Sequence, residues 1–508
     1  MPKQRPAGAV TDRGRELAAG LAALVASSPG RPVQASHAPF DGTLLGEVPI
    51  STQDDVEAAV ETARTAQQLW AGRSLAARRA VVARFVALLL DREQDILDLV
   101  QAESGKSRLS AFEEFADVIL TARYYERNAG RHLRPRRRKG AAPVLTRTTE
   151  YRIPKGVVGV ISPWNYPLTL AVSDAIPALL AGNGIVLKPD SQTPFTALLM
   201  LKLLRQAGLP EDLFRIVTGP GTSIGPALIG QVDFLMFTGS SQTGKTVARQ
   251  CAERLIGFSA ELGGKNPMLV LADADIAKAA AGAVYACFSN SGQLCVSIER
   301  IYVHADVHDR FLAAFTAKVE GIRMGAGPDW EIGMGSLISA AQVERVDLHV
   351  QDALAKGAQL LTGGRCLRSA SRTAPLTLPR ALSLSLSLSR FSFFVFLLVS
   401  LVWTSTFLFA CVCSVVSFSA LFLFLSALDS DPLRPLDARF SLGRGAQSAD
   451  AHPSAAHAAV TAVRAPRSSS ILPSFLSILI PFLPFCLIYL HPQFLISLFV
   501  LSPSSEHN

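Results

Sequence analysis

Strand-like and helix-like runs alternate along the middle of this 508-residue chain. Before Arg152, residues 54–70 and 75–103 carry apolar residues three and four positions apart, which is the helical spacing. After Arg152, short apolar runs typical of buried strands recur between helix-like segments, at 157–162, 184–187, 214–217, 234–237, 267–271 and 300–303. Alternation at this spacing predicts an α/β fold in which helices cover parallel sheets.

The composition changes near residue 366. Charged residues number 76 in residues 1–365 but only 14 in the last 143 residues. Residues 391–428 hold no charge and exceed the roughly 20 residues that a membrane-spanning helix needs. A second apolar run, 471–501, is interrupted by prolines. The literal interpretation of residues 366–508 is therefore a membrane-associated tail.

The same tail has a second interpretation. Of the 48 residues in 381–428, 32 are Phe, Ser or Leu, all of which have codons made only of pyrimidines. An alternating Leu-Ser run is what a translated CT repeat yields, and low complexity without a packing rationale should not be forced into structure. We favour the interpretation that 366–508 is a mis-translated or unstructured low-complexity tail.

A cysteine and a glutamate stand 34 residues apart in two motifs: Glu261 begins ELGGK and Cys295 ends FSNSGQLC. A lone free cysteine is most often a small buried hydrophobe, so Cys295 by itself is a weak signal. A carboxylate in a second motif strengthens the prediction that Cys295 is catalytic, because a thiolate is a strong nucleophile and a carboxylate can activate water. The pair predicts covalent catalysis by a thiol.

A proline-rich loop follows the first strand of the alternating region. Pro163 and Pro167 enclose Trp-Asn-Tyr and keep the loop out of the sheet. The Asn165 amide on this stiff loop is suited to donate to a developing oxyanion. An ordinary turn asparagine is the simpler interpretation of Asn165 taken alone.

Residues 239–246 read GSSQTGKT, a complete match to the P-loop pattern between a strand-like and a helix-like run. A nucleotide triphosphatase is therefore the alternative function. Against it, no apolar run that ends in a magnesium-binding aspartate stands out downstream.

Four motifs, PWNYP, FTGSSQTG, ELGGKNP and GQLC, resemble the aldehyde dehydrogenase superfamily in their order and spacing, from about residue 40 to about residue 365. IVLKPDSQTP (185–194) and GFSAELGGKNPM (257–268) are similar to its NAD(P)-dependent succinate-semialdehyde dehydrogenase branch. The resemblance implies a Rossmann-like NAD(P)-binding domain over 41–260, with oligomerisation strands near 130–152, after an N-terminal extension over 1–40.

The resemblance also implies an α/β thiol-catalytic domain, which here covers only 261–365. The Glu-x-Phe-Gly-Pro motif that the family carries further on is missing. A truncated domain leaves an unpaired sheet edge, which favours aggregation or loss of activity. An inactive, membrane-associated relative is thus a further alternative.

By resemblance, an aldehyde is oxidised through a thiohemiacetal and a thioester on Cys295. The Asn165 amide and the Cys295 N–H would hold the oxyanion, and Glu261 would activate water. The resemblance further implies an NAD(P) site formed by Ile161, Pro163, Trp164, Lys188, Ser191, Thr238, Gly239, Ser240, Gly244 and Leu262.

Two positions depart from the family pattern. Ser191 stands where many NAD-dependent members carry a ribose-binding glutamate, so NADP is expected to be tolerated or preferred over NAD. Asp174 stands where several members carry a lysine, and no role is assigned to it.

The remaining features exclude other classes of function. A net charge of +8 is modest for this length, and the basic run 134–139 is best explained as solvated charge, so no nucleic-acid partner is expected. The seven cysteines suggest no disulfide framework, and no His/Cys cluster has metal-ligand spacing, so no metal is expected. The N-terminus lacks a sustained apolar core. We expect a cytoplasmic homo-oligomer acting on a small aldehyde, with an organellar or membrane location as the alternatives.

Overall fold

The structure is a computed structural model that describes residues 7–142, 146–364, 366–368, 377–379, 383–385 and 460–465. The two apolar runs 391–428 and 471–501, and most of the predicted low-complexity tail, lie outside these residues. Within the described part of the chain, no helix has the length and apolar character needed to cross a membrane.

Five parallel strands form the first sheet, in the spatial order β7-β6-β5-β8-β9. They are β5 (Val157–Ile161), β6 (Gly184–Lys188), β7 (Phe214–Ile216), β8 (Phe234–Gly239) and β9 (Gly257–Leu262). The predicted parallel sheet is therefore confirmed. The chain goes from β5 to β6 on one side and later to β8 on the other, so the winding reverses beside β5. In open α/β sheets such a reversal marks the ligand crevice.

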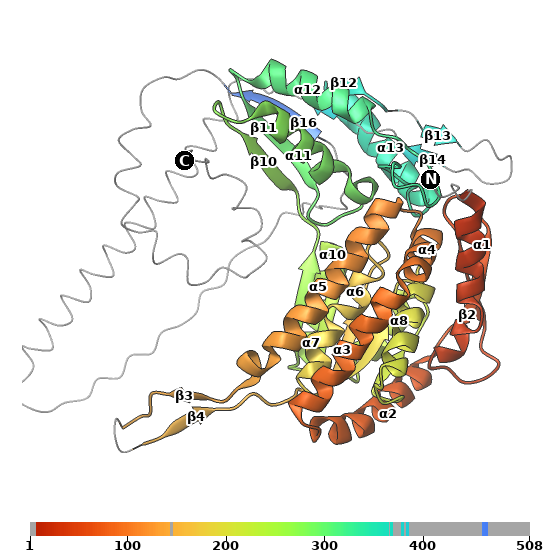
Figure 1. The fold of residues 1–508 in the computed structure, drawn as a ribbon, viewed down its shortest axis with the longest axis vertical. Coiled ribbons are helices and arrows are strands. Elements are labelled where there is room, and N and C mark those ends of the chain that lie inside the picture. Colours follow the sequence, from red (N-terminus) through yellow and green to blue (C-terminus); the bar gives the residue numbers. More distant parts are fainter. Residues whose placement is uncertain are drawn as a thin grey trace, which may run out of the picture. The chain divides into compact units, whose positions relative to one another are not determined.

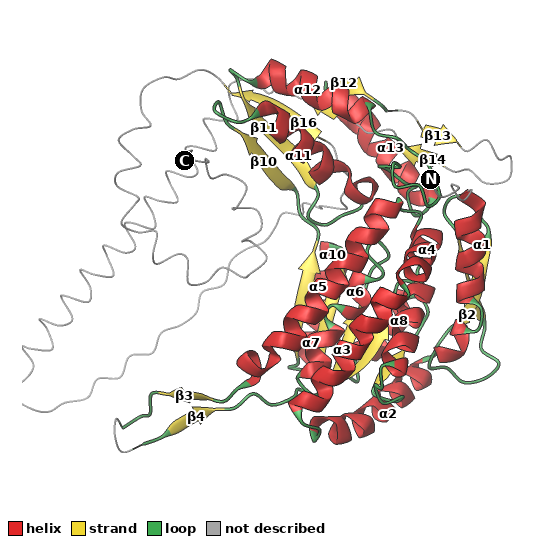
Figure 2. Cartoon of the chain, in the orientation of Figure 1, coloured by secondary structure: helices red, strands yellow, loops and turns green. Residues whose placement is uncertain are grey.

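Helices cover both faces of this sheet (Figure 2). One face packs against α2 (Gln53–Ala71), α9 (Gly221–Ile229) and α10 (Ser241–Glu253). The other packs against α3 (Leu75–Asp91), α5 (Arg108–Leu133), α7 (Ala175–Leu180) and α8 (Pro194–Gln206). Along β6, Val186 packs on the face covered by α2, α9 and α10, whereas Ile185 and Leu187 pack on the opposite face. Burial on both faces explains why these strands read as unbroken apolar runs.

The predicted helical segment 75–103 is divided into two helices. α3 ends at Asp91 and α4 (Glu93–Ser104) begins at Glu93, with Arg92 at φ −107° and ψ 18° between them. Glu93 and Asp95 lie in the first turn of α4, where acidic side chains stabilise a helix N-terminus. α4 ends at Ser104, and the C-cap residue Gly105, with a φ of 75°, turns the chain toward Lys106.

A second sheet has the order β10-β11-β16-β15-β12. β10 (Asn266–Val270) and β11 (Ile298–His304) are parallel neighbours, which confirms the strands predicted at 267–271 and 300–303. The other members are β12 (Gln359–Thr362), β15 (Ser383–Ser385) and β16 (Val460–Ala465). α11 (Ile276–Phe288) and α12 (His308–Glu320) pack on β11, with Phe311 and Phe315 fully buried among them.

An antiparallel hairpin of β3 (Arg136–Arg138) and β4 (Thr148–Glu150) follows α5 (Figure 1). Residues 134–139 are all exposed, in line with the expected solvated charge run, and Arg138 pairs with Glu150. The remaining described elements are α1 (Ala7–Ala18), η1 (Leu21–Leu24), β1 (Val33–His37), β2 (Leu44–Pro49), α6 (Thr169–Val172), η2 (Ser289–Gly292), α13 (Ala340–Ala355), β13 (Cys366–Arg368) and β14 (Thr377–Pro379).

Candidate active site

Cys295 lies on an exposed turn between α11 and β11. Asn290, Ser291 and Gly292 precede it with φ values of 50°, 59° and 75°, three left-handed residues in a row. Such a backbone costs free energy for residues other than glycine and persists only where the surroundings hold it. The conformation of this turn is therefore explained by the position it gives to Cys295 rather than by local stability.

The surrounding protein desolvates the Cys295 thiol and raises its pKa. Backbone N–H groups of Cys295 and Val296 oppose this shift, whereas the nearby Glu261 carboxylate reinforces it. N–H groups directed at the sulfur stabilise negative charge there. When the sulfur bonds to a carbonyl carbon, the same N–H groups can donate to the oxyanion on that carbon.

Buried amide side chains hold the turn in place. Asn290 Nδ2 donates to the carbonyl oxygens of Asn165 at 2.8 Å and Gln293 at 3.2 Å. Gln293 Oε1 accepts from the Ile338 N–H at 3.1 Å. These contacts fix the left-handed backbone from two sides of the turn.

The Asn165 side chain reaches the same turn. Its Nδ2 donates to the carbonyl oxygen of Gln293 at 2.9 Å, two residues before Cys295. An amide nitrogen carries two hydrogens, so this contact uses one of them. The structure thus brings together Asn165 and the Cys295 turn, which are 130 residues apart in the sequence.

Glu261 lies on β9, one residue before the strand ends, and its side chain is exposed. Its carboxylate is close enough to Cys295 and to Asp174 to raise the pKa of both. Burial is the larger cause for Asp174, and the two effects together raise its pKa to about 6. Asp174, to which the sequence assigned no role, is therefore an electrostatic neighbour of the predicted base.

The predicted cofactor residues lie at the carboxyl edge of the first sheet. Most are at the end of a strand or just beyond it, and parallel strands all end at the same edge. Ile161, Lys188, Gly239 and Leu262 are the last residues of β5, β6, β8 and β9. Thr238 lies within β8, and the loops just beyond the strands carry Pro163, Trp164, Ser191 and Ser240.

Lys188 is buried at this edge, and its Nζ donates to the Pro189 carbonyl oxygen at 2.7 Å. Burial lowers the pKa of its amine. Ser191 Oγ donates to the Gly219 carbonyl oxygen at 3.1 Å. A Cβ on Gly221 would lie 3.9 Å from Lys188 Cε, which is an ordinary van der Waals contact, so Gly221 is a close neighbour of the lysine.

One further candidate, Gly244, lies in the first turn of α10. Ser240 is the N-cap of this helix, and its Oγ accepts from the Thr243 N–H at 3.1 Å. A Cβ on Gly244 would approach Leu262 Cδ2 to 2.6 Å. The missing side chain of Gly244 therefore lets the end of β9, next to Glu261, pack on the first turn of α10.

Comparisons with known proteins agree with this geometry. A model of the aldehyde dehydrogenase family matches residues 25–378. The chain belongs to the aldehyde dehydrogenase family.

Individual relatives carry related names. A Mycolicibacterium smegmatis protein provisionally named succinate-semialdehyde dehydrogenase NADP(+) is 53% identical over 325 residues, 64% of this chain and 63% of the relative. A Mycobacterium tuberculosis protein with the same provisional name, number 2, is 49% identical over 360 residues, 71% of this chain and 68% of the relative. The chain therefore spans about two thirds of the length of these relatives.

Among solved structures, succinate-semialdehyde dehydrogenase from Burkholderia pseudomallei superposes with a TM-score of 0.67 at 31% identity. The match covers 70% of this chain and 73% of that structure. The aldehyde dehydrogenase fold expected from the motifs is thus confirmed.

The P-loop alternative is not supported. β8 ends at Gly239 and α10 begins at Ser241, so a single residue separates strand from helix. Gly244, Lys245 and Thr246 lie inside α10, whereas a P-loop needs an open loop of backbone N–H groups before its lysine. In this chain, residues 239–246, which match the P-loop pattern, form the junction between β8 and α10.

Sequence reasoning missed two charged residues beneath the site, Lys106 and Glu114. Both side chains are fully buried, and they form an ion pair with each other. One signal was present: Glu114 falls three residues after Ala111 and four before Val118, on the apolar face of α5. A carboxylate at such a position needs a buried partner.

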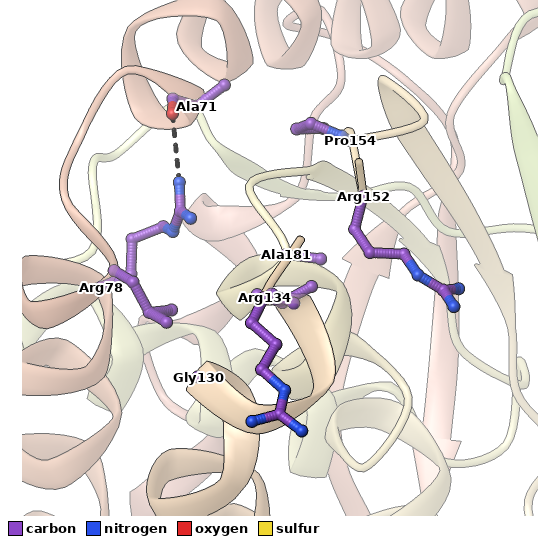
Figure 3. Close-up of a pocket in the computed structure, with 9 residues that line it drawn as sticks. Ala71, Arg78, Gly130, Arg134, Arg152, Pro154 and Ala181 are labelled. Carbon is purple, nitrogen blue, oxygen red and sulfur yellow. Dashed lines mark hydrogen bonds between the residues drawn. The ribbon is translucent and has the colours of Figure 1, made fainter. Parts of the chain in front are cut away.

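A cavity of about 320 Å³ opens elsewhere in the described part of the chain. Figure 3 shows it between Ala71, Arg78, Gly130 and Ala181, with Arg134 and Arg152 extending in different directions. None of its lining residues belongs to the predicted catalytic or cofactor set. It is therefore separate from the candidate active site.

Proposed function

We propose that this chain is an NADP-dependent aldehyde dehydrogenase and that its substrate is succinate semialdehyde. One observation carries the proposal: the amide of Asn165 and the turn that presents Cys295 meet through a 2.9 Å hydrogen bond. Glu261 lies within electrostatic reach of the same thiol. The names of the curated relatives support the substrate and the cofactor.

In this proposal the Cys295 thiolate attacks the aldehyde carbon, and the carbonyl oxygen becomes an oxyanion. The Asn165 amide and the Cys295 N–H donate to that oxygen, which is where negative charge develops. After the carbon is oxidised to a thioester, Glu261 takes a proton from water, and the hydroxide displaces the thiol. The exposed position of Glu261 fits this role because the water must enter from solvent.

The carboxyl edge of the first sheet fits a dinucleotide. Lys188 supplies a cation, and the N-terminus of α10 supplies backbone N–H groups suited to a pyrophosphate. When bound, the nicotinamide supplies the hydride acceptor for oxidation. Ser191 adds no negative charge that would repel a 2′-phosphate, which supports NADP over NAD.

The proposal includes a cytoplasmic homo-oligomer. The exposed β3–β4 hairpin supports it, because the edges of an isolated two-stranded ribbon carry unpaired backbone groups. Light scattering of the purified 508-residue chain tests this part; a monomer at micromolar concentration would contradict it.

The test of function uses the 508-residue chain with succinate semialdehyde, measuring NADPH formation by its absorbance. Expected are aldehyde-dependent turnover, a higher kcat/KM with NADP than with NAD, and no turnover by Cys295→Ala. Cys251→Ala serves as the matched control, because Cys251 is buried in α10 away from the site. A folded wild-type chain that forms no NADPH, or a Cys295→Ala chain that still does, would refute the proposal.

A further inference from the structure

A fully buried ion pair lies beneath the loop that carries Asn165. The side chains of Lys106 and Glu114 are both 0% exposed, and their charged groups contact each other. Taking two charges out of water is costly, and replacing such a pair by apolar residues often leaves a protein equally stable. Stability alone is therefore a weak reason for the pair.

Both members of the pair also bond to the loop. Lys106 Nζ donates to the Asn165 carbonyl oxygen at 2.8 Å and lies 4.3 Å from the centre of the Tyr166 ring. Glu114 Oε2 accepts the N–H groups of Leu168 at 2.9 Å and Thr169 at 3.2 Å. The lysine thus holds the beginning of the segment 165–169, and the glutamate holds its end.

The same region of the chain supports the Cys295 turn. The Asn165 carbonyl oxygen that accepts from Lys106 also accepts from Asn290 Nδ2 at 2.8 Å. The Asn290 N–H in turn donates to Ser110 Oγ at 3.1 Å. Because Ser110 and Glu114 are four residues apart on α5, one face of that helix touches both catalytic segments.

We propose that Lys106 and Glu114 are a positioning pair that sets the Asn165 amide relative to Cys295, and thereby the geometry of the oxyanion pocket. This inference rests on the proposed function for its meaning. Neither residue is expected to touch the substrate; they act through the backbone of residues 165–169. Misplacing a reacting group by about 1 Å can cost about 100-fold in rate.

The test uses acylation of Cys295 by p-nitrophenyl acetate, which needs the thiol and the oxyanion pocket but no cofactor. The double variant Lys106→Met, Glu114→Gln removes both charges together, so neither is left buried and unpaired. We expect its nitrophenolate burst to slow by about 10- to 100-fold. Alkylation of Cys295 by iodoacetamide, which forms no oxyanion, should change little.

A cycle with Asn165→Ala separates positioning from general destabilisation. In the wild-type background Asn165→Ala should slow the burst by about 100-fold or more. In the double variant it should slow the burst much less, because the amide is already misplaced. Equal losses in the two backgrounds would overturn the inference.

The matched control is a second buried ion pair, Asp98 with Arg108, which joins α4 to the first turn of α5, where Arg108 also donates to Gln94 and Gln101 of α4. Asp98→Asn, Arg108→Met should keep the wild-type burst rate, and an equal slowing there would overturn the inference. Should the Lys106, Glu114 variant fail to fold by circular dichroism, the single variant Glu114→Gln takes its place. A folded Glu114→Gln chain with the wild-type burst rate also overturns it.

Formation of NADPH from the aldehyde, measured on the same samples, tests the proposed function separately. A wild-type chain that gives the burst but no NADPH contradicts aldehyde oxidation. In that case, slowing of the burst in the pair variant still supports the positioning inference.

Discussion

The side-chain amide of Asn266 donates to the backbone carbonyl oxygen of Cys295 at 2.8 Å. It also donates to the carbonyl oxygen of Ser297 at 3.0 Å, so the first residue of β10 closes the turn on the far side of the nucleophile. Asn266 follows Glu261 by five residues. One short segment therefore carries the proposed base and also holds the backbone of the nucleophile.

The isosteric change Asn266→Asp tests this connection. It replaces a donor by a carboxylate that faces two carbonyl oxygens, so the turn should shift away. We expect kcat for aldehyde oxidation to fall by about 10- to 100-fold, because the thiol loses its position. Steady-state NADPH formation measures the effect.

Asn128→Asp is the matched control for that substitution. Asn128 makes a similar amide contact with a carbonyl oxygen, that of Tyr124, at 2.8 Å on an exposed part of α5. Its kcat should equal that of the wild-type chain. A normal kcat in Asn266→Asp would instead mean that the turn holds its shape without Asn266.

Glu261→Gln should move two properties in opposite directions. The Glu261 carboxylate raises the pKa of the Cys295 thiol, so removing its charge lowers that pKa and enlarges the thiolate fraction near neutral pH. Alkylation of Cys295 by iodoacetamide at pH 7.5 should accelerate, and its pH profile should move to lower pH. Aldehyde oxidation should fall, because no carboxylate then activates water. A slower alkylation would show that Glu261 does not act on the thiol electrostatically.

The fold was largely predictable because burial leaves a plain pattern. The runs that became β5, β6 and β8 are apolar on both faces, which only a covered parallel sheet requires. The division of 75–103 was missed, since apolar spacing continues across Arg92 and only the acidic first turn of α4 marks the new helix.

The site was predictable where chemistry needs particular residue types. Cys295, Glu261 and Asn165 stand in motifs, and the structure brings Asn165 to the Cys295 turn. Lys106 and Asn266 were not predicted as site residues. A lysine after a glycine, or an asparagine between a lysine and a proline, reads as a surface residue, and only tertiary contacts show that each holds a catalytic backbone segment.

Ser191→Glu should change the preference between cofactors. A carboxylate at this position can bind ribose hydroxyls but repels a 2′-phosphate, so kcat/KM with NADP should fall and the ratio of NAD to NADP efficiency should rise by about 10-fold or more. Gln68→Glu adds the same charge on the exposed face of α2 and should leave the ratio unchanged. An unchanged ratio in Ser191→Glu would indicate that residue 191 does not approach the ribose.

The buried carboxyl group of Glu103 should make the free energy of unfolding depend on pH. The group is fully buried and accepts from the N–H groups of Phe195 and Thr196 at 2.6 and 2.8 Å, at the start of α8. Burial raises its pKa from 4.5 to about 7, although these hydrogen bonds oppose the shift. The folded state therefore binds a proton more tightly than the unfolded state, so this group's contribution to stability is complete below pH 4.5 and is lost as pH rises toward 7. The loss is on the order of 3 kcal/mol.

The variant Glu103→Gln tests this expectation, because its side chain stays neutral at every pH. The free energy of unfolding of variant and wild type is measured in urea at pH 5 and at pH 7.5. Relative to the wild type, the variant should be more stable at pH 7.5 than it is at pH 5. A difference that is the same at both values would mean that Glu103 is ionised in the folded chain across this range.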